Sequence, residues 1–171
     1  MTAAEALSAL CSGEDAAIYA YSVAGARVAG ARRRRALTAL DSHRAHRDRI
    51  ASMIVAADGT PPGSAVAYAL PGPVGTPAAA RELMALVDNG LVGLYADAAA
   101  TLTGADRRWA VRTAAECAVS AVDWGAQSQA FPVAGTVAAS PTSPASPAAS
   151  AAPAPSASTP PAASTAAPSA Q

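Results

Sequence analysis

Apolar and small residues recur every three or four positions along residues 7–28. This spacing keeps one side of a helix turned toward a partner helix. The stripe comprises Leu7, Cys11, Glu14, Ile18, Tyr21, Gly25 and Val28. Glu14 is its one charged member, and a glutamate inside a buried stripe must be protonated, paired with a cation or bound to a metal. The pattern therefore predicts a helical bundle with a polar site inside it.

Four helices of this kind are expected along the chain. They cover residues 3–29, 32–57, 77–101 and 103–125. Gly30 is a residue type expected just past a helix end, and Thr76 followed by Pro77 is typical of a helix start. The residues Thr103–Asp106 have the spacing of a capping box. Asn89-Gly90 would ordinarily mark a turn, but the apolar stripe continues in phase on both sides, which predicts one continuous third helix.

The connections between these helices predict how the bundle is wound. The short turn at Gly30 requires the first two helices to be antiparallel. The Pro- and Gly-rich residues 58–76 then span up to about 60 Å at ~3.3 Å per residue, which is longer than either neighbouring helix. A segment that long can return along the whole bundle and make the third helix parallel to the second. Two helical hairpins joined by one long crossover is the connectivity of ferritin-like bundles.

Composition supports an all-α fold and sets its limits. Alanine supplies 51 of the 171 residues, whereas Phe, Trp and Tyr together supply seven, and alanine is the best helix former. Residues 134–171 contain no charged or aromatic residue and are rich in Pro, Ala, Ser and Thr. Such a segment predicts a disordered tail. The folded domain is therefore expected to cover residues 1–133, with Phe131-Pro132 folding back over one end.

Charge and targeting signals exclude several classes of partner. Twelve arginines are balanced by twelve acidic residues, so no net field favours nucleic acid or a membrane. The run Arg32–Arg35 is interpreted as solvated residues at a helix end. No secretory signal or membrane-spanning stretch is recognised, which predicts a cytoplasmic protein with Cys11 and Cys117 reduced in the core. A homo-oligomer is compatible with the sequence, as is a protein or small-molecule partner of unknown identity.

Several short motifs resemble one family. They are Glu14–Tyr21, His43–Asp48, Ala67–Pro71, and Trp124 with Phe131-Pro132. They occur in order across nearly all of residues 5–133 and resemble the small ferritin-like domains of unknown function found in high-GC bacteria. The resemblance implies a ferritin-like four-helix bundle and no particular activity.

The ligand pattern of di-iron and di-manganese bundles is only partly present. Such sites use a Glu from each of two helices and a Glu-x-x-His from each of the other two. Glu14 matches the ligand of the first helix, whereas Asp41-x-x-Arg44 has an arginine where histidine is needed. Glu116 is followed three residues later by Val119, so the second imidazole is also missing. Asp88 lies at the edge of its stripe, and His43-x-x-His46 has the spacing without the carboxylate.

Three interpretations of the polar site follow. The favoured one is a buried charge network of Glu14 with His43, Arg44 and Arg47, because guanidinium groups pair with a buried carboxylate and repel a metal. The second is a metal site for iron or manganese formed by Glu14, His43 and Glu116. The third is an enzyme with His43 as general base. We expect that the protein has no cofactor. The expected function is that of a non-catalytic binding or assembly module with a degenerate metal site. An enzymatic function is disfavoured but stays open.

Overall fold

The structure of the chain is a computed structural model that describes residues 1–128. Four α-helices make up this part of the chain, and no strand occurs among its residues. The helices are α1 (Ala3–Gly25), α2 (Gly30–Ala56), α3 (Pro77–Thr101) and α4 (Gly104–Trp124). The predicted all-α class is confirmed. The predicted tail from residue 134 and the fold-back of Phe131-Pro132 lie outside the described residues.

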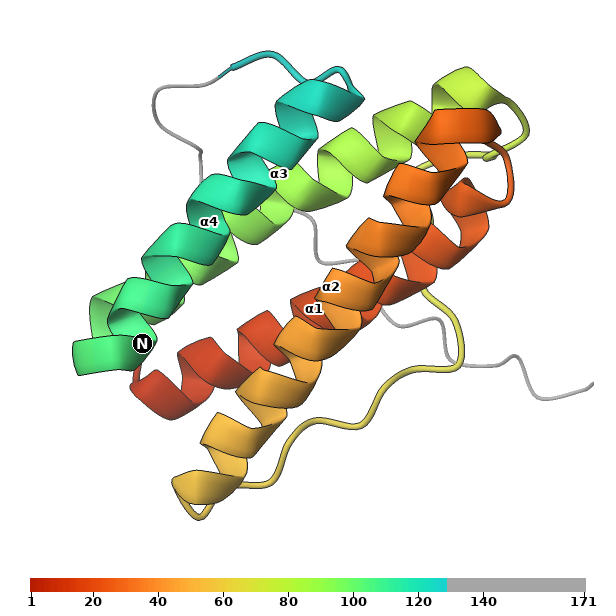
Figure 1. Cartoon of the computed structure of the whole chain (residues 1–171). Helices are drawn as coiled ribbons and strands as arrows, with labels where there is room; N and C mark the ends of the chain where they lie inside the picture. The colour runs from red at the N-terminus through yellow and green to blue at the C-terminus, as the bar shows by residue number, and fades with distance from the viewer. Residues whose placement is uncertain (129–171) are drawn as a thin grey trace, which may run out of the picture.

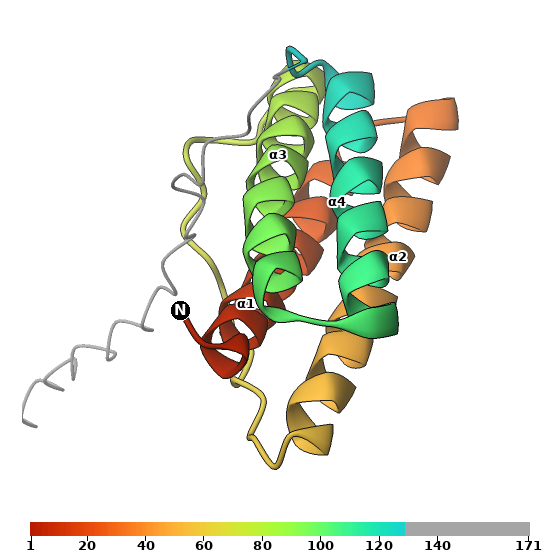
Figure 2. The same ribbon diagram turned by 90° about the vertical axis from the view of Figure 1, so that its left-hand side faces the viewer.

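The helices run in the directions that the connections predict. α1 and α4 run one way along the bundle, and α2 and α3 run the opposite way (Figures 1 and 2). The segment between α2 and α3, yellow in Figure 1, returns along the length of the bundle. α2 is therefore antiparallel to α1 and parallel to α3.

The four helices are not equivalent in their packing. α1 packs against α2 and α3, and α3 packs against α4. The two central helices, α1 and α3, are each buried on a wide face because each has neighbours on two sides. α2 and α4 meet through long side chains instead of close backbone packing.

The helix ends differ from the predicted ones at two places. α1 ends at Gly25, one turn earlier than expected, and Gly30 has a φ of 58° as the first residue of α2. Thr76 caps α3 as predicted, since its hydroxyl accepts a hydrogen bond from the Ala79 amide at 3.1 Å. Thr103 precedes α4 without a side-chain cap, so the expected capping box does not form. The following Gly104 has a φ of 56°, which glycine adopts without strain.

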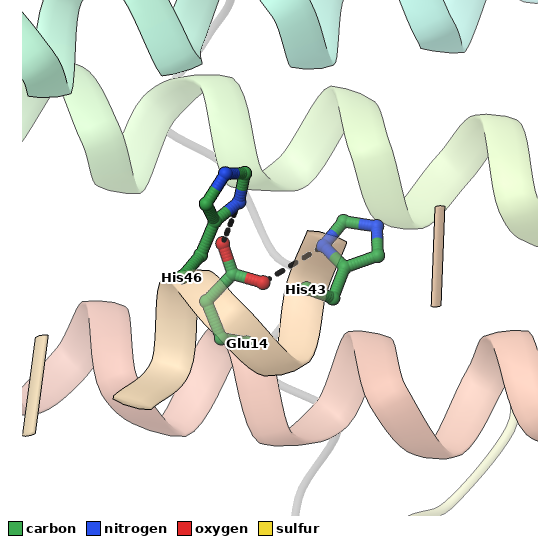
Figure 3. Close-up of side chains that lie close together, drawn as sticks. All are labelled: Glu14, His43 and His46. Carbon is green, nitrogen blue, oxygen red and sulfur yellow. Dashed lines mark hydrogen bonds and ion pairs between the residues drawn. The ribbon is translucent and has the colours of Figure 1, made fainter. Parts of the chain in front are cut away.

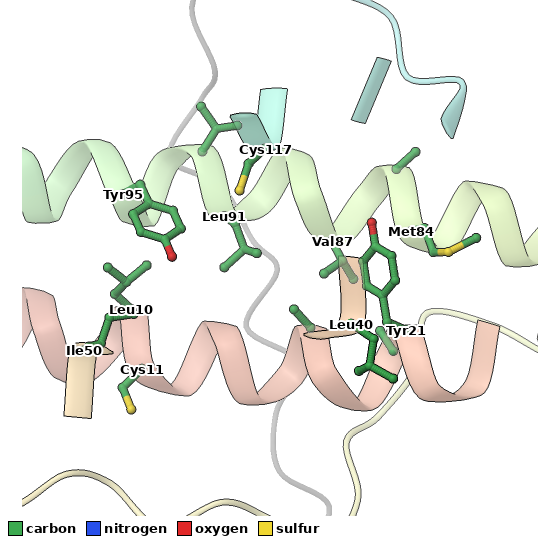
Figure 4. Close-up of a cluster of buried hydrophobic side chains, with 14 of the residues drawn as sticks. Leu10, Cys11, Tyr21, Leu40, Ile50, Met84, Val87, Leu91, Tyr95 and Cys117 are labelled. Atoms are coloured by element: carbon green, nitrogen blue, oxygen red, sulfur yellow. The ribbon is translucent and has the colours of Figure 1, made fainter. Parts of the chain in front are cut away.

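The core lies between α1 and α3 and extends to the inner faces of α2 and α4 (Figure 4). Leu10, Ile50, Met84 and Leu91 are almost completely buried. Cys11 and Cys117 are both buried and unpaired, which agrees with their expected role as small core residues.

One described helix reaches the length and composition of a membrane span, contrary to the expectation that none would. This helix is α3, with a mean hydropathy of 1.2 over its most apolar window and 61% of that window buried inside the bundle. Its apolar residues pack against α1 and α4, as in the core helix of a soluble domain.

Candidate functional site

Glu14 lies in the middle of α1 with its side chain completely buried. Its Oε2 atom is 2.8 Å from Nδ1 of His43, which comes from α2. Its Oε1 atom accepts a hydrogen bond from the Tyr95 hydroxyl of α3. Figure 3 shows the carboxylate between His43 and His46. Both oxygens of the buried carboxylate are therefore engaged, by residues from two other helices.

His43 bridges two carboxyl groups. While Nδ1 faces Glu14, Nε2 is 3.4 Å from Oδ1 of Asp88, a residue of α3 that is 1% exposed. The other Asp88 oxygen accepts a hydrogen bond of 2.7 Å from the Tyr21 hydroxyl. Tyr21 in turn accepts a hydrogen bond of 2.8 Å from Nε1 of Trp124. All four helices thus contribute to one buried polar cluster.

The carboxyl groups determine the charge of His43. Burial would lower the pKa of His43, but its pairing with the carboxyl groups of Asp88 and Glu14 outweighs this effect and raises the pKa to about 9. Burial would raise the pKa of Glu14, but the pairing with His43 and the hydrogen bond from Tyr95 bring it below its ordinary value. At neutral pH, Glu14 is therefore a carboxylate and His43 an imidazolium, held together in a water-poor interior.

His46 adds a third side chain that could ligate a metal ion to the cluster. It lies one turn after His43, with its Nδ1 atom 3.5 Å from Oε1 of Glu14. This nitrogen is buried and has no hydrogen-bond partner. The ring packs edge-on against Tyr95 and Trp109, at centroid distances of 6.2 and 6.0 Å. One donor atom from each of Glu14, His43 and His46 lies within 4.8 Å of the others.

Three of the predicted site residues lie outside this cluster. Arg44 is half exposed and pairs with Asp41 at 3.0 Å, because it lies 100° around α2 from His43. Arg47 is also at the surface of the α1–α2 contact, 3.7 Å from Asp15 and not paired with Glu14. The cluster therefore contains two imidazoles and two carboxyl groups but no guanidinium.

Glu116 is the third of these residues, and it is exposed on α4. Its neighbour Cys117 faces the core instead. A ligand set that includes Glu116 is not assembled, and the expectation that Glu116 could join Glu14 and His43 was wrong.

Two tryptophans of α4 cover the cluster where α2 and α4 face each other. Arg35 of α2 lies 5.1 Å above the Trp124 ring, and Arg49 lies 4.4 Å above the Trp109 ring. Each arginine also pairs with a carboxylate of α4, Arg35 with Asp123 and Arg49 with Asp106. Cation–π contacts of this kind are favourable even where the side chains are exposed to solvent. They hold α2 against α4 on either side of the two histidines.

The pKa of His43 predicts how stability depends on pH in the metal-free protein. The folded-state pKa of about 9 exceeds the unfolded value of about 6.5. The stabilisation is therefore fully present below the unfolded pKa and is lost as pH rises. Between pH 6.5 and 8.5 in a chelator, the free energy of unfolding should fall by up to about 1.4 kcal/mol per pH unit. Urea titrations would measure the slope, and His43→Gln should flatten it. An equally steep slope in the variant would contradict the assignment.

Comparison with known proteins places the chain in a family. A family model described as a domain of unknown function, DUF4439, matches residues 6–137. The chain belongs to the DUF4439 family. A crystal structure of a conserved hypothetical protein, Rv2844, from Mycobacterium tuberculosis is similar, with a TM-score of 0.68 and 30% sequence identity over 71% of this chain and 94% of that chain. No curated protein matches the chain. The DUF4439 match includes every residue of the buried cluster, from Glu14 to Trp124.

Proposed function

We propose that this DUF4439 domain binds one divalent transition-metal ion in the centre of its bundle, through Glu14, His43 and His46. The observation that carries the proposal is the convergence of three donor atoms within 4.8 Å, two of them from imidazoles, in a buried part of the bundle. Two imidazoles and one carboxylate form a ligand set that proteins use for Zn²⁺ and for non-haem Fe²⁺.

The residues around these donors support the same proposal. In metal sites, a ligating histidine usually turns its other ring nitrogen to a carboxylate, which fixes the ring orientation. Nε2 of His43 faces Asp88 in this way, and Asp88 is held by Tyr21. The Tyr95 hydroxyl likewise fixes the orientation of Glu14 by donating a hydrogen bond to its carboxylate. The unpartnered Nδ1 of His46 is a buried polar atom that a metal ion would satisfy.

Guanidinium groups inside the site would repel a metal ion. Arg44 and Arg47 lie outside the cluster, so this electrostatic objection does not apply. His46 also supplies the second imidazole that the Glu-x-x-His pattern lacked. Imidazole-rich sites suit iron and zinc better than manganese, so we propose iron or zinc ahead of manganese.

The same donor set limits what the ion could do. Dinuclear oxygen-activating sites require four carboxylates and two imidazoles around two ions, and only Glu14 and Asp88 reach the centre of the described bundle. We therefore infer a mononuclear, degenerate relative of such sites, in a cytoplasmic ferritin-like domain that serves as a binding or assembly module. The ferritin-like assignment is supported by the single long crossover and the helix directions. When bound, the ion would act as a Lewis acid or a structural centre.

A second candidate is a purely structural charge network without metal. The 2.8 Å contact between Glu14 and His43 favours it. A proton shared between the carboxylate and the imidazole stabilises both buried groups, so that no metal ion is needed.

Metal content and titration distinguish the two candidates. Full-length protein purified without chelator should contain about one equivalent of iron or zinc per chain by elemental analysis. After chelation, Co²⁺ should restore one equivalent with visible d–d absorption, and His46→Ala should lose this absorption. The exposed Glu116→Ala is the matched control and should behave as wild type. Protein that holds less than about a tenth of an equivalent and gives no Co²⁺ spectrum would favour the charge network.

A further inference from the structure

The outward side of α4 carries apolar residues where a solvated helix normally has polar ones. Val111, Val119 and Val122 are 56%, 62% and 45% exposed. Ala115 is exposed between them, so the four residues follow one another at steps of four, four and three. They form one stripe, about 16 Å long at 1.5 Å per residue. We call Val111, Ala115, Val119 and Val122 the α4 stripe.

The other sides of α4 already have partners within the described bundle. Ala110, Cys117 and Ala121 are buried on its inner side, toward α3 and the core. Asp106 and Asp123 pair with arginines of α2. The α4 stripe points away from both neighbours, because its residues lie about 180° around the helix from the buried ones. Within residues 1–128, no other element covers it.

Charged residues beside the stripe indicate which molecule fits. Arg108 and Arg112 lie in the N-terminal half of α4, whereas Glu116 and Asp123 lie in its C-terminal half. Within residues 1–128, Arg108, Arg112 and Glu116 form no ion pair. A second α4 placed antiparallel along the stripe brings Arg112 of each copy near Asp123 of the other, where the carboxylate would lie between Arg112 and the Arg35 of its own chain. A parallel second copy would instead place like charges opposite each other.

We propose that the chain forms a symmetric dimer in which the α4 stripes of two copies pack antiparallel. A two-fold axis produces this arrangement, since it places the same surface of each copy against its equivalent. A contact between two helices over three turns is smaller than the ~1,600 Å² of a standard interface. The dimer should therefore be weak, with association visible only in the micromolar to millimolar range. This proposal does not depend on a bound metal.

Sedimentation equilibrium of the full-length chain at several concentrations tests the dimer. Wild type should show a reversible monomer–dimer equilibrium. Val119→Glu, at the middle of the stripe, should weaken association at least tenfold, because each copy would bury a carboxylate against the other. Val66→Glu adds the same charge at a position that is 92% exposed in the crossover segment, and it should associate as wild type does.

A charge variant provides a second measurement if Val119→Glu folds poorly. Arg112→Glu should also weaken the dimer. The control is Arg33→Glu, which makes the same charge change at an exposed position of α2 and should leave association unchanged. A chain that stays monomeric to about 1 mM would overturn the proposal. Association unchanged in both Val119→Glu and Arg112→Glu would overturn it too, because another surface or segment of the chain would then make the contact.

Discussion

Replacing Glu14 by alanine is expected to lower the free energy of unfolding by about 3–5 kcal/mol. The substitution leaves the His43 imidazolium buried with Asp88 as its one remaining carboxyl partner. It also removes the acceptor of the Tyr95 hydroxyl, a fully buried group whose lost hydrogen bond costs further free energy. Chemical denaturation in the presence of a chelator measures this effect on the charge network alone. A loss of this size would unfold a marginally stable domain at moderate temperature.

Two comparisons show whether the charge is responsible. Glu14→Gln keeps the shape and an acceptor for Tyr95, so it should cost less than the alanine variant. Glu116→Ala removes the same chemical group from an exposed position of α4 and should change stability by no more than about 0.5 kcal/mol. If Glu14→Ala is as stable as Glu116→Ala, the buried carboxylate is not important for folding.

The heptad spacing of apolar residues is enough to predict that Glu14 is buried, and its side chain is completely buried. One helix buries one stripe, and seven positions at steps of three and four leave little freedom for the position of that stripe. The direction of each helix was equally predictable, since a turn of few residues and a crossover of nineteen permit few arrangements. Both inferences depend on local spacing and chain length alone.

The partners of Glu14 were harder to predict because they depend on how two helices rotate against each other. Residues three and four positions after His43 lie on neighbouring lines of α2, and rotation of the helix decides whether His46 or Arg47 points inward. Arg44 and Arg47, which follow His43 and His46 in the sequence, have long side chains that can reach solvent from partly buried positions. A pattern of residue types could not distinguish these cases, whereas the helix packing does.

The burial of Asp88 is hard to predict from the sequence for a related reason. A single stripe of apolar residues places it at an edge, but α3 packs against both α1 and α4, so its buried face is wider than one stripe. Asp88 and Tyr95, seven residues apart on α3, both contact the polar cluster, and Leu91 is buried between them in the sequence. A signal for this existed in the sequence, since a helix with two neighbours in a bundle should bury polar residues at the border of its main stripe.

The position of Asp88 leads to the second prediction, which concerns metal affinity. Asp88→Asn is expected to weaken binding of Co²⁺ or Zn²⁺ by about 10–100-fold. The amide keeps the shape and can still accept a hydrogen bond from Nε2 of His43, but it removes the negative charge that makes the imidazole a stronger ligand. None of the three proposed ligands is changed, so the expected result is weaker binding at unchanged stoichiometry.

Competition against a chelating dye would measure the dissociation constant for wild type and variant. Glu82→Gln, an exposed carboxylate to amide change on the same helix, is the matched control and should bind as wild type does. The Co²⁺ absorption spectrum should keep its intensity at saturation in Asp88→Asn, because the ligand number is unchanged, while its band positions shift slightly with the altered imidazole. A variant that binds as tightly as wild type would show that Asp88 does not orient His43 toward a metal. The buried aspartate would then serve the charge network alone, with His43 as a cation shared between two carboxyl groups.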